Sequence, residues 1–404
     1  PVHVFGRVLR TNDSAGYNLR PRHYLLKEQP YQMPNQQPVN AKSGRPVHGS
    51  INPSELRALG LKLEDLLDFS ASISPIGPPE GVWEAIRSVD LSAYPDPECL
   101  ELREAICRHI STPSRNISID RVLAGNGSTE IFHLLTRIYL ANQGTALLLT
   151  PTYGEYDGAC RLAGAEILNL EADLSGDFRW DIGEASSIIK SKKPELVIVC
   201  NPNNPTGVYL DRQEIEALAD AAEDAGSLLV VDEAYLSFVE EPWDSLELLD
   251  RAEVMLVRSM TKDYAQTALR LGYALASEEV VSRLREYQPD WSVNGLAQKA
   301  GVSALADAGY LPGAREAVFS AKRFLSDELG ALGLEVPRSE ANFILVKVGD
   351  AAKWRSQLLA KGMVVRDCTS FGMPEYIRVG IRPLADCQLL AAAMAQVVQT
   401  ALAD

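Results

Sequence analysis

Metal-binding patterns are missing from this 404-residue sequence, which has only six cysteines and five histidines. The cysteines form no Cys-x-x-Cys pair and the histidines are dispersed, so no zinc site is indicated. Reduced thiols buried in a cytosolic enzyme are the simplest interpretation. The sequence also lacks an apolar run of the ~18–20 residues that cross a bilayer, and its first residues contain no hydrophobic signal region. We therefore predict a cytoplasmic protein with no membrane partner and no metal site.

Basic residues are scarce as well: 39 lysines and arginines stand against 54 aspartates and glutamates, which gives a formal net charge of -15. This excess argues against a nucleic-acid-binding surface, whereas a small basic pocket for an anionic molecule is compatible with an acidic exterior. The hydrophobic content of 46% and the charged content of 23% are typical of a soluble globular protein. A chain of this length can form about two to three structural units.

The pattern of apolar residues divides the chain into three parts. Residues 1–45 are polar and lack sustained periodicity, so we expect an N-terminal arm with little order. Residues 86–294 alternate short apolar strands with helices, which predicts a large α/β domain with a mostly parallel sheet covered on both faces. A long helical stretch over 295–332, later strand signals and a final helix follow. We expect 295–404, together with 46–85, to form a smaller α+β domain.

Polar side chains follow five predicted strands in succession, at the edge where an open α/β sheet binds its ligands. After the strands at 122–124, 146–149, 196–200, 228–231 and 254–257 come Gly127-Ser128-Thr129, Tyr153, Asn204, Asp232 and Lys262, the last with Ser259, Thr261 and Arg270 nearby. Each alone has an ordinary explanation, such as a helix cap, a turn, an ion pair or a solvated lysine. Together they predict a pocket for an aromatic, phosphorylated, electrophilic cofactor, a description that pyridoxal phosphate matches.

Four motifs in this order carry a resemblance to a known family: Asn-Pro-Asn-Asn-Pro-Thr-Gly at 201–207, Asp-Glu-Ala-Tyr at 232–235, Ser-Met-Thr-Lys at 259–262 and Arg-Leu-Gly-Tyr at 270–273. Over roughly residues 46–400 the sequence resembles the pyridoxal-phosphate-dependent class I/II aminotransferases of fold type I. The resemblance implies an α/β fold with a large cofactor-binding domain and a smaller α+β domain.

The resemblance also implies a role for each residue. Lys262 would be the Schiff-base lysine and would later move the α-proton, Asp232 would pair with the pyridine nitrogen, and Tyr153 would stack on the ring. The ring hydroxyl would be bound by Asn204 and Tyr235. The phosphate would be held by Ser128, Thr129, Ser259 and Arg270, with Gly127 and Thr261 beside them in the cofactor site. Tyr94 would reach the phosphate of the neighbouring subunit, which implies a homodimer with shared active sites.

The substrate end is predicted from the segment 376–382. Arg378 lies in a strand pattern and matches the family's arginine for the α-carboxylate of an amino-acid substrate. A planar guanidinium can bind a carboxylate through two parallel hydrogen bonds. The alternative is a structural arginine paired to an acid. The predicted substrate-binding set also contains Arg382, His48 and Ser74.

Two branches of the family share these motifs. The segments 48–49, 67–78, 291–294 and 378–382 are similar to threonine-phosphate decarboxylases of cobamide synthesis, and histidinol-phosphate aminotransferases share the same scaffold. The sequence departs from the decarboxylase pattern at Ser72 and Ser74, where asparagines are usual, and at Ser50, where a glycine is usual. The asparagine replaced by Ser74 is also usual in the aminotransferase branch. We predict an aminotransferase that acts on a small, phosphorylated amino acid or amine. A phospho-amino-acid decarboxylase is the alternative, and a non-catalytic regulator on the same fold is a remote one.

Overall fold

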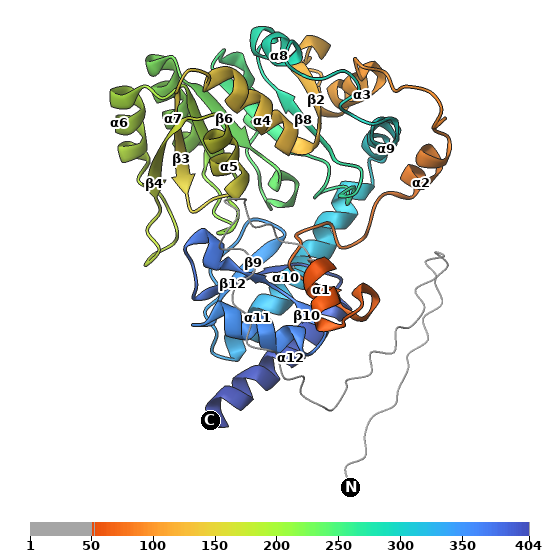
Figure 1. The fold of residues 1–404 in the computed structure, drawn as a ribbon, viewed down its shortest axis with the longest axis vertical. Helices are drawn as coiled ribbons and strands as arrows, with labels where there is room; N and C mark the ends of the chain where they lie inside the picture. Colours follow the sequence, from red (N-terminus) through yellow and green to blue (C-terminus); the bar gives the residue numbers. More distant parts are fainter. Residues whose placement is uncertain (1–50, 52, 404) are drawn as a thin grey trace. The chain divides into compact units, whose positions relative to one another are not determined.

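A seven-stranded sheet with the strand order β2-β8-β7-β6-β5-β3-β4 forms the centre of the fold (Figure 1). The computed structural model describes residue 51 and residues 53–403, so the predicted arm and the candidate residue His48 lie outside the described residues. The strands are β2 (Val122–Asn126), β3 (Thr145–Thr150), β4 (Glu166–Glu171), β5 (Leu196–Cys200), β6 (Leu228–Asp232), β7 (Val254–Ser259) and β8 (Leu271–Leu275). All neighbours pair in parallel except β8, which is antiparallel to both β2 and β7.

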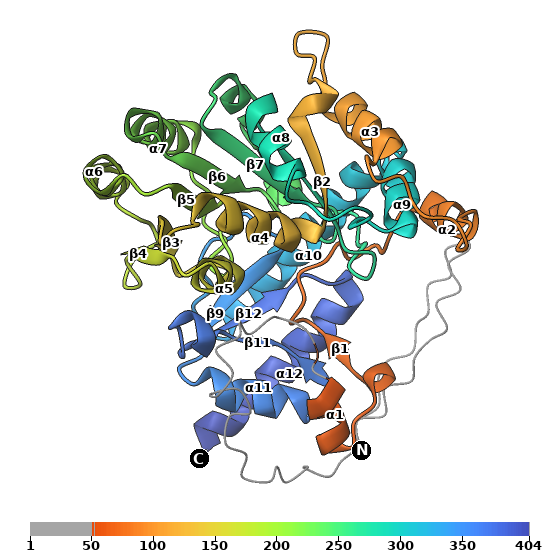
Figure 2. The same cartoon turned by 45° about the horizontal axis from the view of Figure 1, so that its top comes forward.

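Both faces of this sheet are apolar and covered by helices (Figure 2). Successive residues of a strand point to opposite faces, so Val197 and Val199 of β5 pack in one apolar cluster while Leu196 and Ile198 pack in another. One face is covered by α4 (Gly127–Tyr139), α5 (Gly154–Leu162) and α8 (Glu278–Arg285), and the other by α3 (Leu100–Ile110), α6 (Ile182–Lys192), α7 (Arg212–Ala225) and α9 (Gly295–Ala306). The predicted mostly parallel sheet between two helical layers is confirmed.

Helix α7 illustrates how the sequence defines the ends of these helices. Its first turn is closed by a capping box, in which the Asp211 carboxylate accepts from the backbone N–H of Glu214 and the Glu214 carboxylate accepts from that of Asp211. Gly226 ends the helix at a φ of 72°, a left-handed conformation that glycine adopts at little energetic cost.

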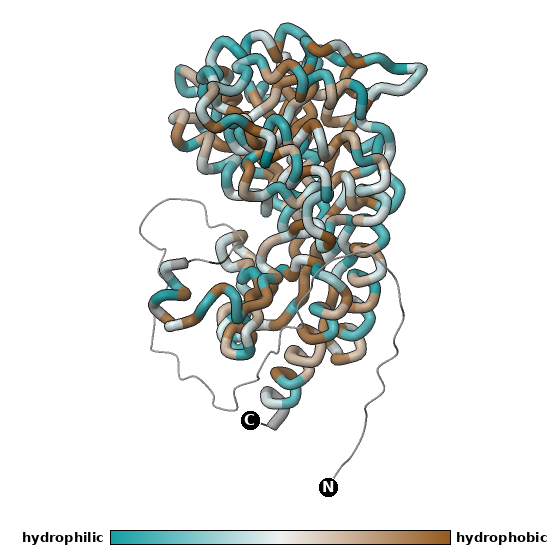
Figure 3. Tube along the Cα trace, turned by 90° about the vertical axis from the view of Figure 1, so that its right-hand side faces the viewer, coloured by the Kyte–Doolittle hydropathy of each residue, from teal (hydrophilic) through white to brown (hydrophobic). Residues whose placement is uncertain are grey.

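Hydrophobic and hydrophilic residues alternate along the helices (Figure 3), as expected where one face of a helix packs on a sheet.

A second apolar cluster surrounds a three-stranded antiparallel sheet with the order β11-β12-β9. Its strands are β9 (Phe343–Lys347), β11 (Arg366–Asp367) and β12 (Tyr376–Gly380), and the helices nearby are α10 (Tyr310–Ala331), α11 (Ala351–Leu359) and α12 (Leu384–Ala403). The short strand β1 (Leu67–Asp68) pairs in parallel with β10 (Met363–Val364), and Phe69 packs in the same cluster as Ile377. The division into two domains with the boundaries given above stays a prediction.

The long helical stretch predicted over 295–332 is two helices, α9 and α10. Between them the Asp307 carboxylate accepts from the backbone N–H of Gly309, a local bond that competes with helix continuation. Helix α9 packs on the central sheet, and α10 begins in the same cluster with Tyr310 and ends in the cluster around the small sheet with Leu329. No helix among the described residues combines the length and apolarity that a membrane crossing requires.

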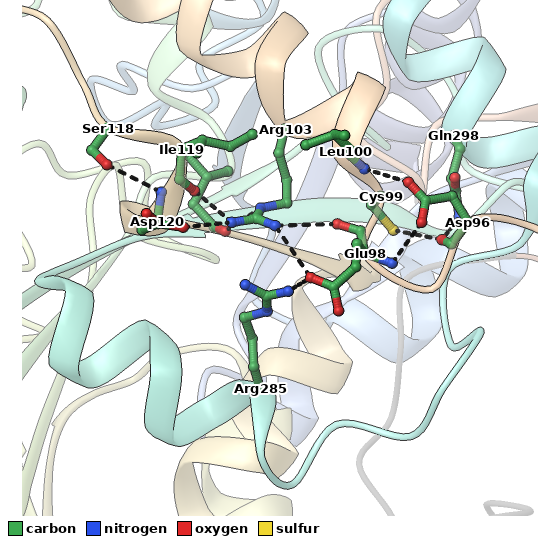
Figure 4. A network of polar contacts seen from close by, with 11 residues as sticks. Asp96, Glu98, Cys99, Leu100, Arg103, Ser118, Ile119, Asp120, Arg285 and Gln298 are labelled. Atoms are coloured by element: carbon green, nitrogen blue, oxygen red, sulfur yellow. Dashed lines mark hydrogen bonds and ion pairs between the residues drawn. The ribbon is translucent and has the colours of Figure 1, made fainter.

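Arg103 of α3 fixes the segment that precedes this helix (Figure 4). Its buried guanidinium donates to the backbone carbonyls of Val122 at 3.1 Å and Ile119 at 2.8 Å, and it lies 3.7 Å from the carboxylate of Glu98. Arg285 of α8 contacts the same carboxylate. The loop that leads from α2 (Glu80–Arg87) to α3 and carries Tyr94 is therefore attached to the start of β2.

Candidate active site

The carboxyl ends of β5, β6 and β7 and the first turns of α4 and α5 line a cavity of about 430 Å³. The predicted residues in its lining are Ser128, Thr129, Tyr153, Asn204, Asp232, Tyr235, Ser259, Thr261, Lys262, Arg270 and Arg378. Parallel strands bring these residues together because their carboxyl ends meet at one edge of the sheet. The lining also contains side chains that the sequence did not single out as site residues: Ser72, Glu155, Tyr156, Cys200, Ala234 and Phe371.

Asp232 is the last residue of β6, and its side chain is 3% exposed. The hydroxyl of Tyr156 donates to its Oδ2 at 2.6 Å, and the backbone N–H of Ala234 donates to its Oδ1 at 3.0 Å. Burial raises the pKa of the Asp232 carboxyl to about 6, although the Tyr156 hydrogen bond, the next largest influence, lowers it. A carboxyl in such surroundings is suited to a cationic or hydrogen-bond-donating partner in the cavity.

Lys262 lies three residues beyond the end of β7, and its side chain is partly buried in the cavity lining. Removal from water, followed by the charges of Arg378 and Arg270, lowers the pKa of its amine to about 8, and Asp232 opposes this shift. Within the described part of the chain, its Nζ has no hydrogen bond and no ion pair. An amine with a pKa near 8 is partly unprotonated at neutral pH, so it can act as a nucleophile or a base.

An anion-binding cradle lies beside this lysine. The first turn of α4 presents Ser128 and Thr129, where backbone N–H groups and the helix dipole favour a negative charge. Gly127 has a φ of 72°, and a Cβ there would lie 2.7 Å from Nη2 of Arg270. The hydroxyls of Ser259 and Thr261, 2.7 Å apart, complete the cradle. Hydroxyls, N–H groups and a guanidinium together suit a phosphate group.

Aromatic and amide groups form the remaining wall. Tyr153 meets Tyr156 edge to face with ring centroids 5.5 Å apart, and burial raises the pKa of Tyr153 to about 12. Tyr235 is buried and meets Phe343 edge to face at 5.1 Å. The side-chain oxygen of Asn204 accepts a hydrogen bond from Arg378. Burial raises the pKa of both Tyr153 and Tyr235, so both hydroxyls stay protonated near neutral pH and can serve as hydrogen-bond donors.

Arg378 of β12 reaches the cavity from the small sheet. It is 4% exposed, donates to the carbonyl of Ser70 at 2.9 Å and lies over the ring of Phe343 at 5.0 Å. Among the described residues no carboxylate forms an ion pair with it, and its Nε has no hydrogen-bond partner. Its cross-strand neighbour is Arg366, whose pKa is lowered to about 10 by burial and by Arg378. Of the two, Arg378 lines the cavity and is suited to an anionic ligand, whereas Arg366 donates to the Ser370 hydroxyl outside the lining.

Three predicted residues lie elsewhere among the described residues. The Ser74 hydroxyl accepts a hydrogen bond from Tyr310 at 2.9 Å and is not part of the cavity lining. Arg382 forms an ion pair with Asp386 at 2.8 Å. Tyr94 is 82% exposed and stacks on Trp291, with ring centroids 4.6 Å apart. The substrate roles of Ser74 and Arg382 and the cross-subunit role of Tyr94 stay predictions.

Sequence reasoning missed two polar groups of the cavity that carry a structural signal. Tyr156 stands three residues after Tyr153 at a helix start, a spacing that places both rings on one face of the helix. In the sequence, Ser72 stands out only as a departure from a family pattern. Its hydroxyl is buried, lines the cavity and has no hydrogen-bond partner in the described part of the chain. No group of histidines, cysteines and carboxylates within residues 53–403 could hold a metal ion.

A lysine and a carboxyl beside a phosphate cradle, at the carboxyl edge of a mostly parallel sheet, define an α/β site for a phosphorylated electrophile. A sequence model described as "Aminotransferase class I and II" matches residues 64–394, and the chain belongs to this family. The predicted pyridoxal-phosphate-dependent family and its fold are thereby confirmed.

The proteins that this chain resembles are named as two different kinds of enzyme. The chain is 32% identical over 332 residues to a putative threonine-phosphate decarboxylase of Caldanaerobacter subterraneus subsp. tengcongensis, which covers 80% of this chain and 88% of that protein. It is 33% identical over 326 residues to the histidinol-phosphate aminotransferase of Symbiobacterium thermophilum, with 80% and 87% covered. The crystal structure of the histidinol-phosphate aminotransferase from Clostridium acetobutylicum superposes with a TM-score of 0.75 at 25% identity, covering 83% of this chain and all of that one.

The raised pKa of Asp232 predicts that Asp232→Asn stabilises the cofactor-free protein at neutral pH. Below about pH 3 both the folded and the unfolded carboxyl hold their proton, so burial of the carboxyl incurs no cost for a charge. As the pH rises from about 4 to 6 the unfolded state ionises first, and the wild type loses stability on the order of 2 kcal/mol. The variant avoids this loss, so its free energy of unfolding should exceed that of the wild type at pH 7 but not at pH 4.

Urea unfolding at the two pH values measures this difference. Asp65→Asn, which neutralises an exposed carboxylate, is the matched control and should change little at either pH. An Asp232→Asn variant that is less stable than the wild type at pH 7 would contradict the conclusion that burial of the ionised Asp232 carboxylate destabilises the fold.

Proposed function

We propose that the protein is a pyridoxal-phosphate-dependent aminotransferase acting on a small, phosphorylated amino acid or amine. The observation that carries the proposal is one cavity holding the Lys262 amine, the buried Asp232 carboxyl and a phosphate cradle. When bound, pyridoxal phosphate supplies an aromatic ring that withdraws electrons from the substrate α-carbon. A cytoplasmic location is part of this proposal, supported by six cysteines that are all free thiols.

The chemistry of the lining fits this cofactor. Ser128, Thr129, Ser259 and Arg270 would hold the phosphate, with the Thr261 hydroxyl beside them and Gly127 leaving room for the Arg270 guanidinium. Asp232 would hold the proton on the ring nitrogen, because a carboxylate at this depth needs a cationic partner. The ring hydroxyl would be bound by Asn204 and Tyr235, and Tyr153 would cover the ring face.

Lys262 would be the proton-transfer group at the substrate α-carbon. Its lowered pKa leaves part of the amine unprotonated near neutral pH, so Nζ would be available as the nucleophile that holds the cofactor. When the amine is no longer bound to the cofactor, Nζ would accept the proton from the substrate α-carbon as a general base. It would then donate that proton to a different atom as a general acid. The absence of a fixed ion pair among its described neighbours leaves the amine able to move between these positions.

Arg378 would orient the substrate. Its unpaired Nε and its position over Phe343 leave a buried cation that can bind an α-carboxylate or a phosphate. The positive charge of Arg366, the cross-strand neighbour of Arg378, adds to a local potential that attracts anions. This pair supports a phosphorylated substrate over an uncharged one.

Decarboxylation of a phosphorylated amino acid is the second candidate. It is favoured by the likeness to the protein named as a putative threonine-phosphate decarboxylase. On one scaffold the outcome depends on whether the C–H or the C–COO⁻ bond of the substrate stands perpendicular to the cofactor ring. Ser72 contributes a short hydroxyl where the decarboxylase pattern has an asparagine, so the substrate would meet a different set of donors. We therefore favour amino transfer.

We also propose a homodimer in which Tyr94 reaches the site of the second copy. The stacked pair of Tyr94 and Trp291 leaves two aromatic side chains 82% and 47% exposed, and nearby Leu91 is 82% exposed. Trp291 has a φ of 57°, a backbone conformation that a bulky residue adopts only at a cost. Gln298 of α9 anchors both segments, because its side-chain N–H groups donate to the carbonyls of Asp96 and Val293. A rigid, exposed aromatic pair is suited to the centre of an interface.

The choice of reaction is tested with the enzyme loaded with pyridoxal phosphate. O-phosphothreonine and histidinol phosphate are supplied in turn with 2-oxoglutarate, and carbon dioxide and glutamate are measured separately. We expect glutamate to form, and Lys262→Ala to lower the rate by about 10²–10⁴-fold because a proton-transfer group is lost. Carbon dioxide release without glutamate would overturn amino transfer in favour of the second candidate.

The dimer is tested by sedimentation over a range of protein concentrations. The wild type should sediment at twice the chain mass of 44.1 kDa. Trp291→Ala should weaken association by about 10³-fold, because a symmetric interface loses two copies of an aromatic worth ~2 kcal/mol each. Leu162→Ala is the control, since Leu162 is 81% exposed on α5. A wild type that stays monomeric at every concentration would refute the interface.

A further inference from the structure

Tyr156 has a contact that the proposed mechanism does not use. Its side chain is fully buried, and its hydroxyl donates to Oδ2 of Asp232 at 2.6 Å. The ring is held from two sides, by Phe132 at 4.8 Å and by Tyr153 at 5.5 Å between centroids. A phenol fixed in this way cannot turn its hydroxyl elsewhere without breaking aromatic packing.

The hydrogen bonds to Asp232 leave one side of the carboxyl open. Each of its oxygens receives one donor, Oδ2 from Tyr156 and Oδ1 from the backbone of Ala234. A carboxylate has about four acceptor positions, so capacity remains on the side that lines the cavity. Among the described residues Tyr156 provides the one side-chain hydrogen bond to this carboxyl, which fixes its rotamer.

Ionisable groups from several neighbouring elements also influence the charge state of Asp232. Lys262, beyond β7, favours the charged carboxylate, and Glu233, the next residue along the chain, disfavours it. Cys200 at the end of β5 and the phenols of Tyr153 and Tyr235 are neutral near pH 7, since burial raises the pKa of each. Tyr156 thus opposes the desolvation of Asp232 more than any other group.

We propose that Tyr156 is a positioning residue that keeps Asp232 ionised and in one rotamer, ready for the protonated ring nitrogen of the cofactor. A hydrogen bond donated to the charged form of a carboxyl stabilises that form. Tyr156 itself stays protonated because burial and the neighbouring carboxylate both raise its pKa. The role rests on the proposed function, in which Asp232 pairs with that nitrogen.

A second buried tyrosine provides the matched control. Tyr264 is 2% exposed and stacks on Tyr310 at 5.4 Å, but its hydroxyl has no hydrogen-bond partner in the described part of the chain. Tyr156→Phe and Tyr264→Phe each remove one buried oxygen and keep the ring. They differ in whether a carboxylate loses its donor.

The first readout is taken without cofactor. The free energy of unfolding is measured from pH 4 to 9 for the wild type, both phenylalanine variants and each of them combined with Asp232→Asn. Tyr156→Phe should move the titration assigned to Asp232 up by at least about one pH unit, a tenfold tighter proton. Tyr264→Phe should not move it, and in the Asp232→Asn background Tyr156→Phe should have no effect on the pH profile.

The second readout is the dissociation constant of pyridoxal phosphate, followed by its absorbance at pH 7. Tyr156→Phe should weaken binding by about tenfold, and Tyr264→Phe should leave it unchanged. An unmoved Asp232 titration in Tyr156→Phe, or an equal movement in Tyr264→Phe, would overturn the positioning role while leaving the proposed function intact. A wild type with the expected titration that binds no pyridoxal phosphate would instead overturn the proposed function, and with it the role toward the ring nitrogen.

Discussion

The site depends on one electrostatic constraint, which is that a carboxyl and an amine of opposite charge share a cavity without forming an ion pair. Asp232 is almost wholly buried and has a raised pKa, whereas Lys262 has a lowered one. Each group is therefore less stable as an ion here than in water. A ligand that brings a cation to the carboxyl and an electrophile to the amine relieves both costs. The two shifted groups together therefore favour a ligand that offers both a cation and an electrophile.

The fold imposes this arrangement through the register of its parallel strands. Asp232 at the end of β6 lies opposite Cys200 of β5 and Val257 of β7, so the carboxyl is fixed in the middle of the sheet edge. Two residues with little steric bulk admit the phosphate cradle, since a Cβ on Gly127 or Gly272 would collide with Arg270 or with the backbone of Ser128. Arg378 arrives from the other sheet and bonds to Asn204. The substrate end therefore joins elements that lie far apart in the sequence.

The central sheet could be predicted because strands buried on both faces leave continuous apolar runs, as in 196–200 and 228–231. Much of the cofactor side of the cavity could be predicted for a related reason, since Ser128, Asp232 and Lys262 each follow such a run within a few positions. Contacts between distant segments could not. Tyr156 lies 76 positions before Asp232, and Tyr310 lies 236 positions after the Ser74 hydroxyl that it engages. Alternation along 70–75 shows that Ser72 and Ser74 share a face, but not that only Ser72 lines the cavity.

The covalent role of Lys262 is tested most directly by trapping the cofactor on the protein. The enzyme is loaded with pyridoxal phosphate, its visible absorbance is recorded, and it is reduced with borohydride and digested for mass spectrometry. We expect a visible band that Lys262→Ala abolishes, and cofactor mass on the peptide that contains Lys262 and on no other lysine. An unchanged band in Lys262→Ala, or the cofactor trapped on a different lysine, would contradict the covalent role of Lys262.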